Sequence, residues 1–324
     1  MNYRDLVTIS HVASQLIYRW IPPPTSPEQA TGAQSPQSSP ASSNDWADLI
    51  NSEANSAASR LSWLPRYLRS QDRSGMGLAQ AIKAHLAAIE SAHARYVVWG
   101  DKEYPPLLRN ISDPPLGLSI RGELSLLYRP AISVVGSRKA SAFAMRESFA
   151  LGRALGERDI AVVSGGALGC DIAAHHGVLA SGRDPAPAIC VFAGGLARLY
   201  PVANDPIFRR LMARRAVLVS ERLWASPCRP MDFTARNRII SGMSSLTLVM
   251  QAAQRSGALV TARRALDQGS EVAVLRHPEG DIRARGSEAL LAEGAWGFSC
   301  ASELIEHANL LEASLASRTD SALQ

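Results

Sequence analysis

The sequence has few cysteines and no long apolar run. Its cysteines lie far apart, without C-x-x-C spacing, at Cys170, Cys190, Cys228 and Cys300. This pattern argues against a disulfide framework or a structural zinc site and indicates reduced thiols. No apolar stretch is long enough to span a membrane, and residues 1–20 lack the layout of a signal peptide. We therefore expect a cytoplasmic protein with no membrane partner.

Common catalytic motifs are absent as well. The sequence contains no G-x-x-x-x-G-K-[ST], H-E-x-x-H or G-x-S-x-G motif, and no spacing suggests a Ser/His/Asp set. His175 and His176 are adjacent, so on a helix they point apart and make a poor chelate. Glu221 is the one acid expected at a strand end, where a structural hydrogen bond is favoured over base catalysis. We predict no catalytic residue, no metal and no cofactor.

Lysine is scarce, so arginine supplies most of the positive charge. Lysine occurs only at Lys83, Lys102 and Lys139, although Lys and Arg together number 34 against 29 acidic residues, a net charge of +5. Arginine can hold a phosphate with two hydrogen bonds and can stack on bases, so this choice favours a polyanionic partner. With 46% hydrophobic and 19% charged residues, the chain is predicted to be globular.

Composition divides the chain into unequal parts. Residues 21–44 are rich in Pro, Ser, Gln and Ala and are predicted to form a disordered linker. Residues 1–20 before it suggest one short helix, and 45–95 after it show the apolar spacing of a small helical region. The main domain is expected at 96–311, followed by a frayed tail at 312–324.

Within the main domain, buried strand-like runs alternate with helical patterns. Such alternation predicts an α/β fold with a doubly wound, mostly parallel sheet. The expected strands are 116–120, 131–135, 160–163, 188–192, 216–219, 246–250 and 271–275, and the expected helices are 142–158, 170–181, 205–214, 233–241, 257–268, 288–291 and 301–311. Residues 101–108 are expected to be extended because of their prolines.

Small residues and arginines follow these strands, where open α/β sheets bind ligands. Gly136-Ser137-Arg138 follows the first parallel strand, and Ser164-Gly165-Gly166-Ala167-Leu168-Gly169 follows the second. Glycine permits close approach to a ligand, arginine binds phosphate, and small residues before a helix form an anion seat. Either segment could instead be a plain strand-to-helix turn. Asp171, in the next helical turn, is expected to cap that helix.

Further candidates lie at the same edge of the predicted sheet. Gly194-Gly195 follows the third parallel strand, and Arg236-Asn237-Arg238 lies where a helix is expected to begin. Because the two arginines diverge on a helix, one could face a pocket while the other forms a structural ion pair. Phe233 could stack on a base or belong to the core. Ser256-Gly257 opens the next helix with another small-residue terminus.

The ordered set of motifs resembles the DprA/Smf family of DNA-processing proteins over residues 96 to 298. The matching segments are Tyr104-Pro105 with Leu108, Asp113-Pro114-Pro115, Arg121-Gly122, Gly136-Ser137-Arg138, Ser164 to Asp171 with His175, Gly194-Gly195, Tyr200-Pro201, Ser220-Glu221, Phe233, Arg236 to Ile240 and Ser256 to Ala262. Leu168 departs from the family, which often has a basic residue there. No winged-helix domain is expected after residue 311.

The resemblance implies an extended Rossmann-like domain that binds single-stranded DNA without catalysis, forms a homodimer and loads the recombinase RecA during natural transformation. Carried over, Gly136, Ser137 and Arg138 would hold phosphate, and Arg236 to Arg238 would shape or line the same pocket. Gly165, Gly166 and Gly169 would let the strand approach.

Three functional hypotheses follow. The first is a single-stranded DNA-binding protein that protects strands and hands them to RecA. The second is a hydrolase for nucleotides or nucleoside phosphates, which tight binding and turnover of mononucleotides would favour. The third is a sensor of a free nucleotide that signals through a partner of the N-terminal region.

Overall fold

The computed structural model describes residues 78–305, and its core is the predicted alternation of strands and helices. The predicted helix at 1–20, the linker at 21–44, residues 45–77 of the helical region and the tail at 312–324 lie outside this range. Among residues 78–305, no helix combines the length and apolarity that crossing a bilayer requires.

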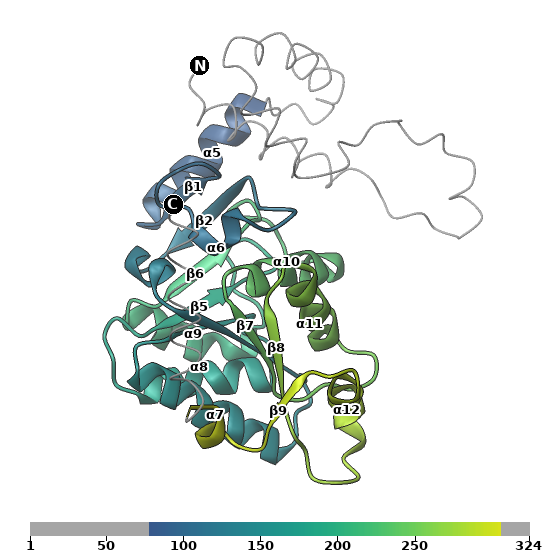
Figure 1. Cartoon of the computed structure of the whole chain (residues 1–324). Coiled ribbons are helices and arrows are strands. Elements are labelled where there is room, and N and C mark those ends of the chain that lie inside the picture. Colours follow the sequence, from purple (N-terminus) through teal and green to yellow (C-terminus); the bar gives the residue numbers. More distant parts are fainter. Residues whose placement is uncertain (1–77, 306–324) are drawn as a thin grey trace, which may run out of the picture.

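One nine-stranded sheet organises the described residues, in the order β1-β2-β6-β5-β4-β3-β7-β8-β9 (Figure 1). Strands β3 to β9 run parallel, whereas β2 pairs antiparallel with both β1 and β6. The strands are β1 (Arg95–Val98), β2 (Gly117–Arg121), β3 (Ala131–Val135), β4 (Ala161–Ser164), β5 (Ala188–Val191), β6 (Val217–Ser220), β7 (Leu246–Val249), β8 (Glu271–Leu275) and β9 (Trp296–Phe298). The mostly parallel α/β fold is therefore confirmed.

The sheet grows in two directions from β3. The chain builds β4, β5 and β6 on one side of β3, then returns to place β7 on its other side, with Ser133 opposite Thr247. This reversal creates a topological switch point between β3 and β7. Ligands of open α/β sheets bind outside the carboxyl ends of the strands at such a point, so the loops that follow β3 and β7 define where a site is expected.

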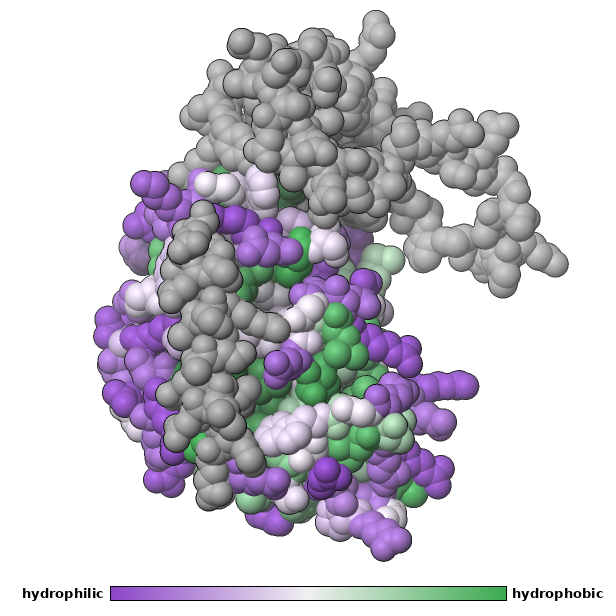
Figure 2. Space-filling view, viewed as in Figure 1, coloured by the Kyte–Doolittle hydropathy of each residue, from purple (hydrophilic) through white to green (hydrophobic). Residues whose placement is uncertain are grey.

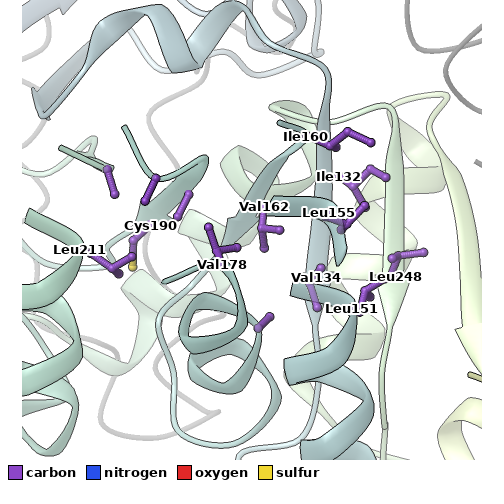
Figure 3. Packing of buried hydrophobic residues seen from close by; sticks show 14 of the residues in the cluster. Ile132, Val134, Leu151, Leu155, Ile160, Val162, Val178, Cys190, Leu211 and Leu248 are labelled. Atoms are coloured by element: carbon purple, nitrogen blue, oxygen red, sulfur yellow. The ribbon is translucent and has the colours of Figure 1, made fainter. Parts of the chain in front are cut away.

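Helices cover both faces because strand side chains alternate in direction. Ile132 and Val134 of β3 join the cluster under α7, α8 and α9 (Figure 3). Ala131 and Val135 join the cluster under α10, α11 and α12. The helices of the fold are α7 (Ala142–Glu157), α8 (Cys170–Ala180), α9 (Asp205–Ala213), α10 (Pro230–Gly242), α11 (Gly257–Asp267) and α12 (Arg285–Ala292).

One end of the sheet carries the N-terminal part of the described chain. Helix α5 (Leu78–Ser91) leads into β1 and packs beside it (Figure 1). The helical spacing expected within 45–95 is confirmed for the part that forms α5, but strand β1 was not predicted. With one exposed and three buried residues it has no clear alternation, and its pairing with β2 is a tertiary event. Edge strand β9, of only three residues, was missed for the same reason.

The extended segment at 101–108 and the start of the helix at 233–241 differ from their predictions. Residues 101–108 are not wholly extended, because α6 (Pro106–Arg109) forms a helical turn with proline at its first position. Helix α10 begins at Pro230 instead of Phe233. Pro230 again occupies the first helical position, and the Asp232 carboxylate accepts a hydrogen bond of 2.9 Å from the Arg229 amide. The Arg236-Asn237-Arg238 segment consequently lies in the middle of α10 and not at its start.

Candidate functional site

The loops after β3, β4, β5 and β7 meet at the carboxyl edge of the parallel sheet. They comprise residues 136–141, 165–169, 192–201 and 250–256. Exposed cations lie on three of them, at Arg138, Lys139, Arg198 and Arg255. Among residues 78–305, none of these four forms an ion pair with an acidic side chain. This edge therefore carries positive charge that is available to an anion.

Arg138 lies beside two aromatic side chains from other segments. Its guanidinium carbon is 4.7 Å from the centroid of the Phe233 ring, at the start of α10. Phe233 in turn meets Tyr200, of the loop after β5, edge to face with 5.8 Å between ring centroids. We call Arg138, Phe233 and Tyr200 the Arg138 cluster. The structure thus brings together two predicted site residues, Arg138 and Phe233, and Tyr200 of the matching Tyr200-Pro201 segment.

The chemistry of the Arg138 cluster suits a nucleotide. The guanidinium can hold a phosphate through paired charge-assisted hydrogen bonds, and its contact with the Phe233 ring orients it. Aromatic side chains offer surfaces on which bases of any sequence can stack. Tyr200 is 49% exposed and the nearby loop residue Leu168 is 43% exposed, so apolar surface is available at this edge. Leu168 adds no charge.

Two glycines allow the loop after β3, residues 136–141, to pack closely against its neighbours; we call this segment the Arg138 loop. A Cβ on Gly136 would lie 2.5 Å from the Cys170 sulfur, and one on Gly169 would lie 2.0 Å from the Ser137 carbonyl oxygen. Gly169 also has φ +84°, a conformation that side chains disfavour. The Cys170 amide donates to the same Ser137 oxygen at 3.3 Å. These glycines allow the first and second loops to pack on each other.

A buried amide holds the far end of the Arg138 loop. The Gln251 side chain, fully buried after β7, accepts from the Ser141 amide at 2.9 Å and donates to the Ser141 hydroxyl at 3.1 Å. It also donates to the Asp281 carboxylate at 2.8 Å. Ser141 in turn caps α7 by accepting from the Ala144 amide. These bonds join the loop after β3 to the loop after β7, which lie on the two sides of the switch point.

The loop after β4 is braced from inside by Asp171. Its buried carboxylate accepts from the Gly165 amide at 3.1 Å and the Ala167 amide at 3.4 Å. The two donors belong to the loop before α8, so Asp171 holds this loop and makes no side-chain cap bond to the helix, whose cap residue is Gly169. These two amides are not free to bind a phosphate. Burial raises the pKa of Asp171, and the nearby Arg236 charge opposes that rise. Ser164, also predicted for this site, is buried and donates to the Val134 carbonyl at 2.6 Å.

Arg236 lies inside the fold, behind the same loop. It is 6% exposed and donates to the carbonyls of Gly165, at 3.0 Å, and Val191. Burial lowers its pKa, although Asp171 favours its charge. A Cβ on Gly165 would fall 2.4 Å from the Arg236 guanidinium. Gly166, at φ +61°, is held from the other side, since the Asn204 amide donates to its carbonyl at 2.8 Å.

Arg238 is engaged in ion pairs on the opposite side of α10. It donates to both carboxylate oxygens of Glu221, at 2.6 and 3.1 Å, and to Asp113 at 2.9 Å. Burial disfavours its charge, but Glu221 and Asp113 outweigh that effect and raise its pKa. The interpretation of Glu221 as a structural hydrogen-bonding residue is confirmed. Of the three predicted site arginines, only Arg138 is exposed to solvent.

The remaining predicted residues divide between packing and open surface. A Cβ on Gly194 would contact Cys228, and one on Gly195 would lie 2.2 Å from the carbonyl oxygens of Leu223 and Trp224. Asn237 is buried, and its amide reaches the Gly257 carbonyl at 3.4 Å. Gly257 itself is exposed, with no atom within 4 Å of an added Cβ. Ser256 precedes it as the N-terminal cap residue of α11.

The model of the family described as DNA recombination-mediator protein A matches residues 95–309, which include the whole parallel sheet and the Arg138 cluster. The chain belongs to this DprA/Smf family. The resemblance inferred from the motifs is therefore confirmed.

Relatives from several bacteria support the assignment. The protein is 34% identical to Protein Smf of Escherichia coli over 228 residues, covering 70% of this chain and 60% of that one. It is 33% identical to DNA processing protein DprA of Bacillus subtilis over 223 residues, covering 68% of this chain and 73% of that one. The chain thus spans less than two thirds of the length of the E. coli relative.

Solved family structures share the fold. DprA of Streptococcus pneumoniae is 26% identical, with a TM-score of 0.66 over 94% of this chain and 98% of its own. DNA processing protein A of Helicobacter pylori, studied for its single-stranded DNA binding mode, is 26% identical, with a TM-score of 0.60. It is matched over 68% of this chain and 98% of its own.

Sequence reasoning missed the side chains that hold the family's loops in place. Asn204 lies in the connection between β5 and α9, and Gln251 lies in the loop after β7; neither belongs to a motif that the sequence analysis singled out. The one available signal was polarity, because Gln251 follows an otherwise apolar strand.

His175 is fully buried in α8, and burial lowers its pKa to about 4. Among residues 78–305 no group of His, Cys, Asp and Glu is arranged to hold a metal ion.

Proposed function

We propose that this protein binds single-stranded DNA at the carboxyl edge of its parallel sheet and takes part in DNA processing during natural transformation. The observation that carries the proposal is the Arg138 cluster, in which an exposed arginine without an acidic partner in residues 78–305 lies over one of two aromatic rings. Family membership supports it, since relatives are DNA-processing proteins and one was solved in a study of single-stranded DNA binding.

The cluster favours single strands over duplexes for a geometric reason. Bases of a duplex are stacked inside it, whereas bases of a single strand can turn outward onto aromatic side chains. Arg138 would hold a phosphate with the Ser137 hydroxyl beside it, and Phe233 with Tyr200 would receive a base. Arg236 would shape the pocket by holding the Gly165 carbonyl from inside. Because every base has an aromatic face, binding would tolerate any sequence.

Beyond strand binding, we propose that the protein acts in the cytoplasm, without catalysis or cofactor, as a homodimer that hands DNA to RecA. The far end of the sheet suits pairing of two copies, because edge strand β9 leaves backbone groups unpaired within the described chain. Exposed Leu266, Ile282 and Trp296 lie in this C-terminal third. Figure 2 shows hydrophobic surface there, over the β8, β9 and α12 region.

The first experiment is a titration of the purified protein into a fluorescent single-stranded oligonucleotide at several salt concentrations, with duplex DNA as competitor. Binding should favour the single strand and weaken as salt rises, with a slope of about 0.7 per neutralised phosphate on the logarithmic scale. Failure of a folded sample to bind single strands would overturn the proposal. Tight binding and turnover of mononucleotides would instead support the hydrolase, and binding without turnover the sensor.

The RecA step is tested separately. RecA nucleation on single strands already covered by a single-strand-binding protein should speed up when this protein is added. An unchanged nucleation rate, with strand binding intact, would remove RecA loading and leave strand binding in place. Sedimentation at several protein concentrations measures the proposed homodimer.

A further inference from the structure

Helix α5 contacts the rest of the fold through a buried histidine. His85 is 5% exposed, and its Nδ1 accepts a hydrogen bond of 3.1 Å from the Trp224 backbone amide. Its ring also meets the Tyr96 ring edge to face, with 5.1 Å between centroids. Trp224 belongs to the segment between β6 and α10, residues 221–229, which we call the Trp224 loop. A residue 139 positions away in sequence thus holds this loop from the N-terminal side.

The Trp224 loop supports the segment that carries Tyr200. Its Trp224 carbonyl accepts from the Ala197 amide at 2.9 Å, and its Ser226 carbonyl accepts from the Gly195 amide at 2.9 Å. The contact is close, because a Cβ on Gly195 would lie 2.2 Å from the Trp224 oxygen. A shift of the Trp224 loop would therefore move the residues that lead to Tyr200.

The same loop also sets the start of α10, where Phe233 lies. Arg222 forms an ion pair of 2.7 Å with Asp232, and both side chains are largely buried. The Arg229 amide donates to the other oxygen of Asp232 at 2.9 Å. Asp232 immediately precedes Phe233 in the first turn of the helix. The Trp224 loop is therefore bonded to the two segments that carry the aromatic members of the Arg138 cluster, whereas Arg138 itself comes from the loop after β3.

We propose that His85 is a positioning residue for single-stranded DNA binding, which acts through the Trp224 loop on Tyr200 and Phe233. This inference rests on the function proposed above. It gives the N-terminal side of the molecule a defined influence on the DNA site. Anything that lifts α5 from the Trp224 loop, such as a protein bound to the N-terminal region, would loosen the stacking part of the site, while Arg138 keeps its place on the loop after β3.

The test compares three variants for affinity to a single-stranded oligonucleotide. His85→Leu removes the acceptor for the Trp224 amide and should weaken binding by roughly three- to tenfold. The salt slope should stay unchanged, because no positive charge is removed from the loop after β3. His85→Asn places a carbonyl oxygen where Nδ1 stood and should restore most of the affinity. His93→Asn, an exposed histidine just after the same helix, is the matched control and should bind like the unaltered protein.

A second measurement distinguishes a failure of this inference from a failure of the proposed function. In the absence of DNA, His85→Leu should speed hydrogen exchange at the Gly195 and Ala197 amides, and His85→Asn should not. Unchanged exchange in a folded His85→Leu variant would overturn the positioning role whether or not DNA binds. In a Phe233→Leu background, His85→Leu should weaken binding much less than it does alone. Fully additive losses of affinity would also contradict the coupling.

Discussion

The loop after β3 and the middle of α10 both carry arginines that the sequence marks as phosphate ligands, yet the fold uses them differently. Arg138 is exposed and rests on an aromatic ring. Arg236 is buried and donates to the carbonyls of neighbouring loops, and Arg238 is paired with Glu221. A guanidinium has five donors, so it can bind an incoming phosphate or hold several loops together. Which of the two it does depends on what surrounds it.

The largest effect is expected where the buried arginine is removed. Arg236→Leu leaves the Gly165 and Val191 carbonyls without their donor and Asp171 without its nearby positive charge. Breaking a buried charged network in this way costs about 3–5 kcal/mol, measured as the free energy of unfolding in urea. The exposed arginine variant Arg198→Ala should change that free energy by less than about 0.5 kcal/mol. Equal stability of the two variants would contradict the internal role of Arg236.

Next in size is the cost of protonating His175. Its pKa is lowered by burial to about 4, from an ordinary value of 6.5, so the unfolded chain binds a proton more readily than the folded one. The contribution of neutral His175 to the free energy of unfolding is therefore fully present above pH 6.5 and is lost as the pH drops toward 4. At about 1.4 kcal/mol per pKa unit, the loss amounts to a few kcal/mol. Urea unfolding across this range should show the decline, and His175→Met should flatten it.

Glycine substitutions sharpen the comparison of packed and open positions. Gly169→Ala forces a side chain onto a backbone at φ +84° and toward the Ser137 carbonyl. It should destabilise the protein by roughly 1–3 kcal/mol and weaken DNA binding, because the Arg138 loop must shift. Gly257→Ala enters open space at the start of α11 and should be neutral or slightly stabilising. Thermal unfolding of both variants measures the difference. Equal losses of stability would contradict the distinction between the packed Gly169 and the open Gly257.

The smallest effect on stability is expected at the exposed arginine. Arg138→Ala should leave the free energy of unfolding within about 0.5 kcal/mol of the original, since no acidic partner within 78–305 loses an ion pair. Affinity for a single strand should fall roughly tenfold, and the salt slope should decrease by about 0.7, the share of one phosphate. Arg264→Ala, an exposed arginine in the last turn of α11, controls for loss of overall charge. An unchanged single-strand binding isotherm in a folded Arg138→Ala variant would contradict the proposed role of Arg138 in phosphate binding.

Much of the fold is predictable because it depends on local patterns. The mainly apolar runs Ala131–Val135 and Glu271–Leu275 are strands in the structure with those same bounds. Strands β1 and β9 were not predicted, because such short segments become strands only by pairing with their neighbours. The start of helix α10 was predicted too late, because a proline and a capping carboxylate extend the helix beyond its apolar pattern. Such boundaries depend on a few polar contacts.

The sequence by itself determined the class of fold, the family and the edge of the sheet at which to look, since strand periodicity and the order of short motifs are local properties. Tertiary structure decided what each motif residue does. It turned Arg236 inward to Gly165, paired Arg238 with Glu221, and placed Arg138 over Phe233 beside Tyr200. Charge and hydrogen-bonding capacity are encoded in a residue type, but exposure and partners arise only when distant segments meet.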